Sequence, residues 1–403
     1  MKKLAMMAIA LMASSMTFAG DSDALKAIMK SKNYADAVQL VNNNLSQLAD
    51  NAEKAKAYNH LVDLAMDKVA AETGIAAENM VAAQTGGKTK PYDTLGMANA
   101  ICDAIYMAIE CNKYDQLPNA KGKVAPKFDK KNAERLWGVR RHLIGIGQDE
   151  ARNDHSENTL RFWGALADSE ADPLFASQDH KAEAEWTGQV CYFAGRYAFD
   201  AKQFDRANKY LDIAMQDPNQ KAEAMNYKLY AMRSNLKNHA DSVACVNQLK
   251  AMYEKEPEND VILDALNSMY DGWKDKAAQN ALLDSHLAKY PNSFTALAGK
   301  GLMAMNDNDA ATAVQWLKKA AAAKPDNAVV FTYLGICYNS MASTNDDNAK
   351  RKELYSNAIE AFDKAKQIDP NKQQVNWGYN RYQAYYALYG EEDPRTKAAE
   401  ADR

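Results

Sequence analysis

The sequence predicts an all-α protein, an α-solenoid in which helix-turn-helix units stack side by side into a superhelix. Three observations predict it. Prolines recur at Pro257, Pro291 and Pro325, with 34 residues from each to the next. Almost every segment carries apolar residues at helical spacing, and none shows the convincing alternation of a strand. A fixed period of this length is typical of repeat architectures, in which each unit contacts only its neighbours.

Small residues recur at fixed places inside the period. In the clearest unit, residues 294–327, places 8, 20, 27 and 32 are Gly301, Ala313, Ala320 and Pro325. Two helices approach closely only where the side chains at their crossing are small, so the glycine and alanines are predicted to lie at helix crossings. Leu317 at place 24 is predicted to fill the space between neighbouring units. Pro325 ends the second helix of the unit.

This pattern resembles the tetratricopeptide repeat (TPR) family, which implies a right-handed superhelix of stacked helix pairs with a C-terminal capping helix. The match is closest from about Ala182 to Pro370. The unit that begins at Ala328 matches only if about 11 residues are inserted, roughly residues 340–354. We expect this insertion in the turn between the two helices.

The match continues upstream with less regularity. Gly147, Thr159 and Trp163 keep the intervals of the clearest unit. In residues 260–291 the second helix fits better with its register shifted by one, which would place three residues at the packing positions: Ala278, Leu282 and Ser285.

The first 20 residues, MKKLAMMAIALMASSMTFAG, have the pattern of a secretory signal peptide. Two lysines precede an apolar run, and Ala19 marks the predicted cut. The run is shorter than the roughly 20 residues that cross a bilayer, so a transmembrane anchor is disfavoured. The first cysteine is Cys102, far from the cut, which argues against a lipoprotein. We expect a periplasmic or secreted protein.

The expected domain plan has four parts. Residues 1–19 are the signal peptide, 20–128 are irregular N-terminal helical repeats, 129–390 are the TPR array with its capping helix, and 391–403 are a charged, frayed tail. The boundary near 128 is suggested by a long loop after Asp115 that contains glycine and proline. The capping helix is predicted over residues 375–389.

The composition of the chain argues against several classes of function. The net charge is −4 with no basic cluster, so nucleic acid is not an expected partner. No later stretch is apolar enough to span a membrane. The five cysteines include no CxxC pair and are interpreted as small buried hydrophobes. The six histidines are far apart in sequence, so we expect no metal, no cofactor and no catalytic constellation.

The TPR resemblance also implies a binding face, because the first helices of successive units line a concave groove. Its places fall on tyrosines, arginines and asparagines, which suit protein or peptide recognition. The alternative is that these side chains only fill the interfaces between repeats. The candidate partner-binding residues are Tyr192, Arg196 and Phe199 in one unit, Tyr227, Tyr230 and Asn238 in the next, Thr332 and Asn339 in a later one, and Trp377, Arg381 and Tyr385 on the capping helix.

The sequence therefore predicts an exported TPR scaffold that binds another protein or peptide in the cell envelope and performs no chemistry. The alternative is a glycan-binding protein, since some envelope sugar-binding proteins resemble TPR scaffolds, although those carry a lipoprotein cysteine that this chain lacks. An enzyme hidden in the region before Asp129 is the third class. The sequence leaves the identity of the partner and the oligomeric state open.

Overall fold

The computed structural model describes residues 20–403, and the predicted signal peptide lies outside them. Within this range the regular elements are all helices, and no strand occurs. The all-α prediction is confirmed. Contacts divide the chain into two compact units, an N-terminal unit that ends at Ser234 and a C-terminal unit over Asn235–Arg403. The predicted domain plan, with its change of regularity near residue 128, stays a prediction.

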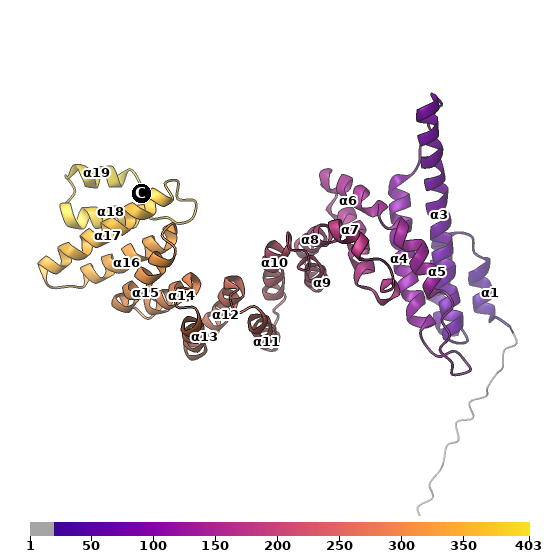
Figure 1. Cartoon of the computed structure of the whole chain (residues 1–403), viewed down its shortest axis with the longest axis horizontal. Helices are drawn as coiled ribbons and strands as arrows, with labels where there is room; N and C mark the ends of the chain where they lie inside the picture. Colours follow the sequence, from indigo (N-terminus) through magenta and orange to yellow (C-terminus); the bar gives the residue numbers. More distant parts are fainter. Residues whose placement is uncertain (1–19) are drawn as a thin grey trace, which may run out of the picture. The chain divides into compact units, whose positions relative to one another are not determined.

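The N-terminal unit begins with a short helix pair and a long hairpin, and it continues with antiparallel helix pairs (Figure 1). Its helices are α1 Asp23–Lys30, α2 Tyr34–Asn44, η1 Leu45–Gln47, α3 Asn51–Thr85, α4 Thr94–Asp115, α5 Asp129–Val139, α6 His142–Arg152, α7 Ser156–Ala171, η2 Pro173–Phe175, η3 Lys181–Glu183, α8 Ala184–Asp200, α9 Phe204–Ala214 and α10 Lys221–Ser234.

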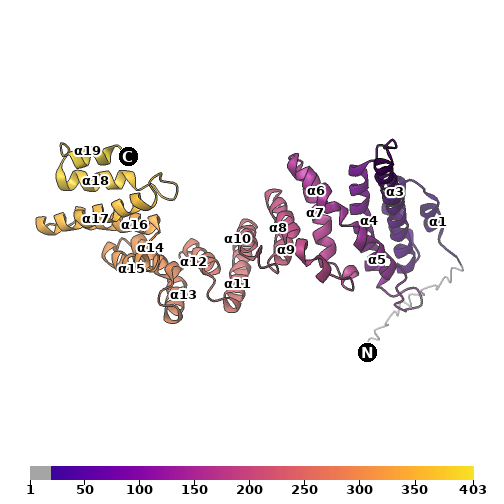
Figure 2. The ribbon, with the colours of Figure 1, turned by 45° about the horizontal axis from the view of Figure 1, so that its top comes forward.

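The C-terminal unit is a row of helices in which each packs against the next (Figure 2). The helices are α11 His239–Lys255, α12 Asp260–Gly272, α13 Lys276–Lys289, α14 Phe294–Asn306, α15 Ala310–Ala323, α16 Ala328–Ser343, α17 Asn348–Ile368, α18 Gly378–Tyr389 and α19 Pro394–Glu400. The three periodic prolines each stand two residues after the end of a helix, namely α11, α13 and α15.

A glycine in the first helix of a pair receives a large side chain from the second helix. Four pairs share this contact: Gly147 with Trp163, Gly195 with Leu211, Gly301 with Leu317, and Gly335 with Phe362. A methyl group on the glycine would lie 2.5–2.7 Å from the nearest atom of the partner side chain. Such a distance is too short for real carbon contacts, so these positions require glycine. The predicted repeat register is confirmed at these four sites.

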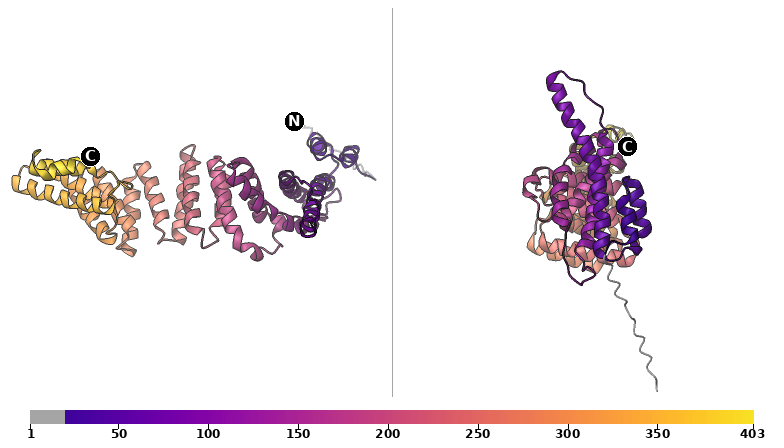
Figure 3. Two further views of the ribbon diagram at one scale, coloured as in Figure 1. Left: turned by 90° about the horizontal axis from the view of Figure 1, so that it is seen from above. Right: turned by 90° about the vertical axis from the view of Figure 1, so that its right-hand side faces the viewer.

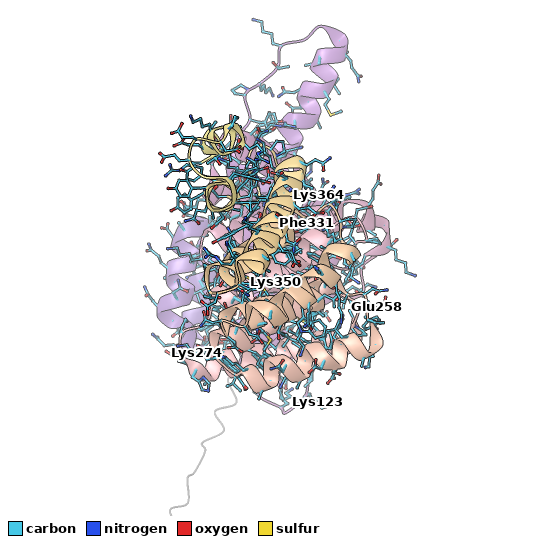
Figure 4. The ribbon with its side chains drawn as sticks, turned by 90° about the vertical axis from the view of Figure 1, so that its left-hand side faces the viewer. Lys123, Glu258, Lys274, Phe331, Lys350 and Lys364 are labelled. Atoms are coloured by element: carbon cyan, nitrogen blue, oxygen red, sulfur yellow. The ribbon has the colours of Figure 1, made fainter. Side chains whose placement is uncertain are left out.

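The sequence spacing between each glycine and its partner side chain gives the length of the insertion. Sixteen residues separate the glycine from its partner in the first three pairs, whereas 27 separate Gly335 from Phe362, so 11 residues are inserted. The insertion lengthens the helices: α16 and α17 have 16 and 21 residues, against 13 and 14 in α14 and α15. Figure 4 shows the long α17 between Lys350 and Lys364.

Our prediction that the insertion forms the turn was therefore wrong. Only residues 344–347 separate the two helices. Asp347 caps α17, where its side chain accepts hydrogen bonds from the backbone N–H groups of Ala349 and Lys350. The inserted residues after it are good helix formers, which explains why they extend α17.

The register shift predicted for α13 was also wrong. The residues that the structure buries there are Gln279, Leu283 and His286, each one position later than Ala278, Leu282 and Ser285. The Tyr253 hydroxyl lies 2.7 Å from Nδ1 of His286 and forms a hydrogen bond with it. Burial lowers the pKa of His286, which favours the neutral imidazole in the core. A satisfied histidine thus occupies a place where sequence reasoning expected a small residue.

The charged tail was predicted to be frayed, and this was wrong as well. Residues 394–400 form α19, which packs against α18. Asp393 caps the helix, and Thr396 and Ala399 are buried. The capping helix α18 begins at Gly378, three residues later than predicted.

The long helix α3 extends well past the helices beside it (Figure 3). Asn79 holds the return segment against this arm: its side-chain amide donates to the carbonyl of Lys90, and its oxygen accepts from the N–H of Lys90, both at 2.6 Å. Met80 and Val81 are exposed on the arm.

All five cysteines are buried, as predicted, and no disulfide joins any two of them. Within residues 20–403, no helix combines the length and the apolar character that crossing a bilayer requires.

The buried alanines of the repeat provide a test of packing. Ala320 is 0% exposed, in a core to which α15 and α16 contribute. Ala320→Leu should overpack this core and lower the free energy of unfolding by about 1–3 kcal/mol. Ala322→Leu, at an exposed position of the same helix, is the matched control and should change little. Equal urea midpoints for the two variants would contradict the assigned register.

Candidate partner-binding site

Two first helices of neighbouring pairs, α8 and α10, present the predicted residues of the N-terminal unit. Tyr192, Arg196 and Phe199 stand four and three residues apart on α8, so they share one side of the helix. Tyr227 and Tyr230 stand three residues apart on α10. The two helices contact each other directly.

Four of these side chains form an aromatic–arginine cluster. The ring centroid of Tyr227 lies 5.9 Å from that of Tyr192 and 6.0 Å from that of Phe199, and both pairs meet edge to face. The guanidinium carbon of Arg196 lies 5.3 Å from the Tyr227 centroid and 5.8 Å from the Tyr192 centroid. Both separations fall in the range of cation–π attraction. The structure therefore joins side chains from two repeats into one site.

The guanidinium of Arg196 has no acidic partner among residues 20–403. Its side chain is half-buried, and its neighbours are aromatic rings. A guanidinium carries five N–H donors, and ring faces do not satisfy them as a carboxylate does. The cluster thus offers hydrogen-bond donors that are not paired with a carboxylate among residues 20–403.

Tyr192 is a buried residue of the cluster. Its ring is 6% exposed, and its hydroxyl donates a hydrogen bond of 3.0 Å to Oε2 of Glu223 on α10. Burial and this hydrogen bond raise the pKa of Tyr192, so the phenol remains protonated at neutral pH. The bond ties α8 to α10 and fixes the ring against which Arg196 rests.

Two further aromatic residues belong to the site, and sequence reasoning missed them. Phe193 lies 5.3 Å from Tyr192 between ring centroids, and 5.9 Å from the guanidinium carbon of Arg196. Trp163 of α7 extends the row, with its ring 5.8 Å from Phe193. The signal for Phe193 was present, since it stands three residues before Arg196 on the same helix.

Comparison with known proteins comes from solved structures alone. The sequence matches no model of a known protein family and no curated protein. Similar solved structures include human IFIT1 dimer with m7Gppp-AAAA, at 12% identity over 81% of this chain and 71% of that one, with a TM-score of 0.37. The C-terminal part of a TPR repeat-containing protein from Cytophaga hutchinsonii is similar at 10% identity, over 63% and 98% of the two chains, with a TM-score of 0.36.

A third similar structure is YrrB, described as a TPR protein with an unusual peptide-binding site, at 15% identity over 61% of this chain and 94% of that one, with a TM-score of 0.24. At such identities and scores the fold assignment depends on the chain itself, on its 34-residue period and its four glycine contacts. The protein has a TPR fold.

The TPR geometry separates the remaining predicted residues from the cluster. Tyr230 is 56% exposed and takes part in none of the ring contacts. Asn238 was predicted on the first helix of its repeat, but α10 ends at Ser234. Asn238 instead caps α11, where its side chain accepts from the N–H of Asp241. Asn238 lies in the C-terminal unit, where it stabilises the start of α11.

Of the two predicted residues of α16, Thr332 is buried and Asn339 is half-buried. Thr332 is 1% exposed, and its hydroxyl donates to the carbonyl of Ala328 one turn earlier. Asn339 donates from its amide nitrogen to the carbonyl of Asn380, at 3.0 Å. The bond links α16 to α18, so Asn339 holds the two first helices together.

The predicted residues of α18 also serve the core. Trp377 is 0% exposed, and its indole N–H donates to the carbonyl of Asp369, so no partner reaches it. Arg381 donates from Nε to Asp363 at 2.6 Å and from Nη1 to Asp402 at 2.8 Å. The Tyr385 hydroxyl donates to the other oxygen of Asp363 at 2.9 Å.

This hydrogen-bonded group corrects the assignment of Trp377, Arg381 and Tyr385 to a binding surface. Burial and the bond to Asp363 raise the pKa of Tyr385 to about 12, which keeps the donor in place. Since Asp363 lies on α17 and Asp402 follows α19, Arg381 joins three helices. The aromatic capping helix is thus anchored by residues that resemble a recognition motif in sequence.

The described residues hold no group of three histidine, cysteine, aspartate or glutamate side chains placed to bind a metal ion. At the N-terminal cluster, the guanidinium of Arg196 and the aromatic rings around it supply binding contacts, so the arrangement can recognise a ligand.

The structural role of Arg381 is testable by stability. Arg381→Ala leaves Asp363 and Asp402 without their guanidinium, and it should lower the free energy of unfolding by about 1–3 kcal/mol. Arg351→Ala, an exposed arginine on α17 at the protein surface, is the matched control. Chemical denaturation that shows the same loss for both variants would contradict the anchoring role.

Proposed function

We propose that the protein is an exported TPR scaffold that binds a protein or peptide in the cell envelope through the aromatic–arginine cluster of α8 and α10. The observation that carries the proposal is Arg196, which is half-buried among aromatic rings and has no acidic partner in the described chain. Aromatic and arginine side chains dominate the binding energy of protein interfaces.

The cluster also has the rigidity that recognition requires. Tyr192 is held by Glu223, and its ring contacts Tyr227 and Phe193, so little conformational entropy is left to lose on binding. A carboxylate or carbonyl group of the partner would satisfy the donors of Arg196, and Tyr230, three residues after Tyr227 on α10, would add exposed aromatic area. A protein segment supplies both kinds of group.

The proposal contains no catalytic step. The guanidinium of Arg196 offers hydrogen-bond donors and no acceptor. Glu223 lies at the edge of the cluster, where it accepts the hydrogen bond of Tyr192. The chemistry gathered at this surface favours binding.

Export is supported by the two lysines, the apolar run and the small residue at the predicted cut in residues 1–19. Mass spectrometry of the protein isolated from its native cells should find Gly20 as the first residue, because the signal peptidase cuts after Ala19. Recovery of the chain with Met1 from the cytoplasm would refute the envelope location.

Partner binding is tested by capture from an envelope extract on the immobilised mature chain. Once a partner is identified, Arg196→Gln and Tyr230→Ala should each weaken its affinity by on the order of 1–2 kcal/mol or more. Both positions are at least partly exposed, so helicity should stay unchanged.

Matched controls lie elsewhere on the same unit. Arg152→Gln changes a surface arginine of α6, and Tyr92→Ala removes an exposed tyrosine of the α3–α4 connection. Both control variants should bind as the parent does. Equal affinity of the parent and the Arg196→Gln and Tyr230→Ala variants, measured by calorimetry, would exclude α8 and α10 as the binding surface.

A further inference from the structure

The inserted residues border a groove on the C-terminal unit. The groove has a volume of about 730 Å³ and lies between α16, α17 and α18. Ser343, in the extra turn that the insertion adds to α16, lines it. Tyr355 of α17 lines it too, and the extra turns at the start of α17 directly precede this residue. A repeat of ordinary length would lack Ser343 and the turns that precede Tyr355.

Tyrosines of α18 form the opposite wall. Tyr379, Tyr382 and Tyr386 follow one another at intervals of three and four residues, so they share one side of the helix. Tyr379 is 49% exposed and Tyr386 is 47% exposed. The rings of Tyr382 and Tyr386 lie 6.0 Å apart between centroids. A capping helix that only covered the end of the core would not need exposed rings.

The polar side chains of the groove are mostly neutral. Ser340 on α16 and Asn380 and Gln383 on α18 supply hydroxyl and amide groups that both donate and accept hydrogen bonds. Two charged side chains, Glu391 and Arg403, also line the groove. Arg403 pairs with Glu400 at 3.5 Å, and its guanidinium carbon lies 4.8 Å from the centre of the Tyr382 ring.

We propose that this groove binds a neutral saccharide. A sugar ring has hydroxyl groups at its edge and C–H groups on its faces. The hydroxyl groups both donate and accept, as serine, asparagine and glutamine side chains do. The faces carry slightly positive hydrogens, which suit the negative face of an aromatic ring.

A peptide fits the groove less well. Peptide recognition relies on apolar anchors that fill apolar pockets. Among the described residues that line the groove, Ile336 is the one aliphatic side chain. Exposed tyrosine rings beside hydroxyl and amide side chains match the polar edge and the apolar face of a sugar ring.

This inference is independent of the proposed function. The saccharide groove belongs to α16, α17 and α18, whereas the aromatic–arginine cluster belongs to α8 and α10 in the other unit. Variants at one site leave the other unchanged, so the two ideas fail separately.

The test is isothermal titration of the full mature chain with neutral oligosaccharides of two to six units, built from hexoses and from N-acetylhexosamines. At least one compound should bind, and Tyr386→Ala should weaken that binding by about tenfold or more, the scale of one aromatic side chain at an interface. Tyr389→Ala is the matched control, because Tyr389 is 37% exposed on the same helix and does not line the groove. It should bind as the parent does.

A variant of Tyr355, the residue that directly follows the insertion, tests the wall that α17 contributes. Tyr355→Ala should also weaken binding, with the circular dichroism spectrum and melting curve checked for each variant. If Tyr386→Ala fails to fold, Tyr379→Ala replaces it, since Tyr379 is the more exposed ring.

Three results would overturn the proposal. The first is the absence of binding to every oligosaccharide in the panel. The second is equal binding by the Tyr386→Ala and Tyr389→Ala variants, which would place the ligand elsewhere. The third is binding of peptides from a random library, with no saccharide bound, that is lost in Tyr386→Ala; the groove would then be a peptide site.

Discussion

Close approach at a glycine governs the helix pairs of this protein. In four of them a large side chain from the second helix lies where the glycine of the first would otherwise carry a side chain, as Leu211 does against Gly195. Because no other residue leaves that space, the contact sets both the distance and the rotation of the two helices. The same contact therefore decides which side of each helix faces the next pair.

The position of the candidate site depends on which side of α8 faces α9. Gly195 turns one side of α8 toward α9, and the adjacent side, with Tyr192 and Arg196, faces α10. Tyr227 then completes the aromatic surroundings of Arg196 from the next pair. The site therefore forms only where two neighbouring helix pairs meet, because neither α8 nor α10 alone surrounds the guanidinium of Arg196.

The C-terminal unit shows how similar residues acquire another role. Arg381 and Tyr385 have the composition and spacing of a recognition surface, yet Asp363 and Asp402 engage them both. The insertion in the preceding repeat has the opposite outcome. It resembles a loop in sequence, but it lengthens two helices and adds a wall to a tyrosine-lined groove. Pairing with residues distant in sequence decided the first case, whereas the Asp347 cap and local helix propensity decided the second.

The sequence by itself determined the helical class, the repeat length and the packing register of most repeats, because these depend on local periodicity and on residue size at fixed intervals. It also indicated four members of the aromatic–arginine cluster, since they share helix faces in adjacent repeats. Only the tertiary structure decided that Trp377 and Thr332 are buried, that Asn238 caps a helix and that residues 394–400 form a helix. The physical reason is that a side chain is free for a partner only if the fold has not already satisfied it. That depends on residues distant in sequence, such as Asp402 for Arg381.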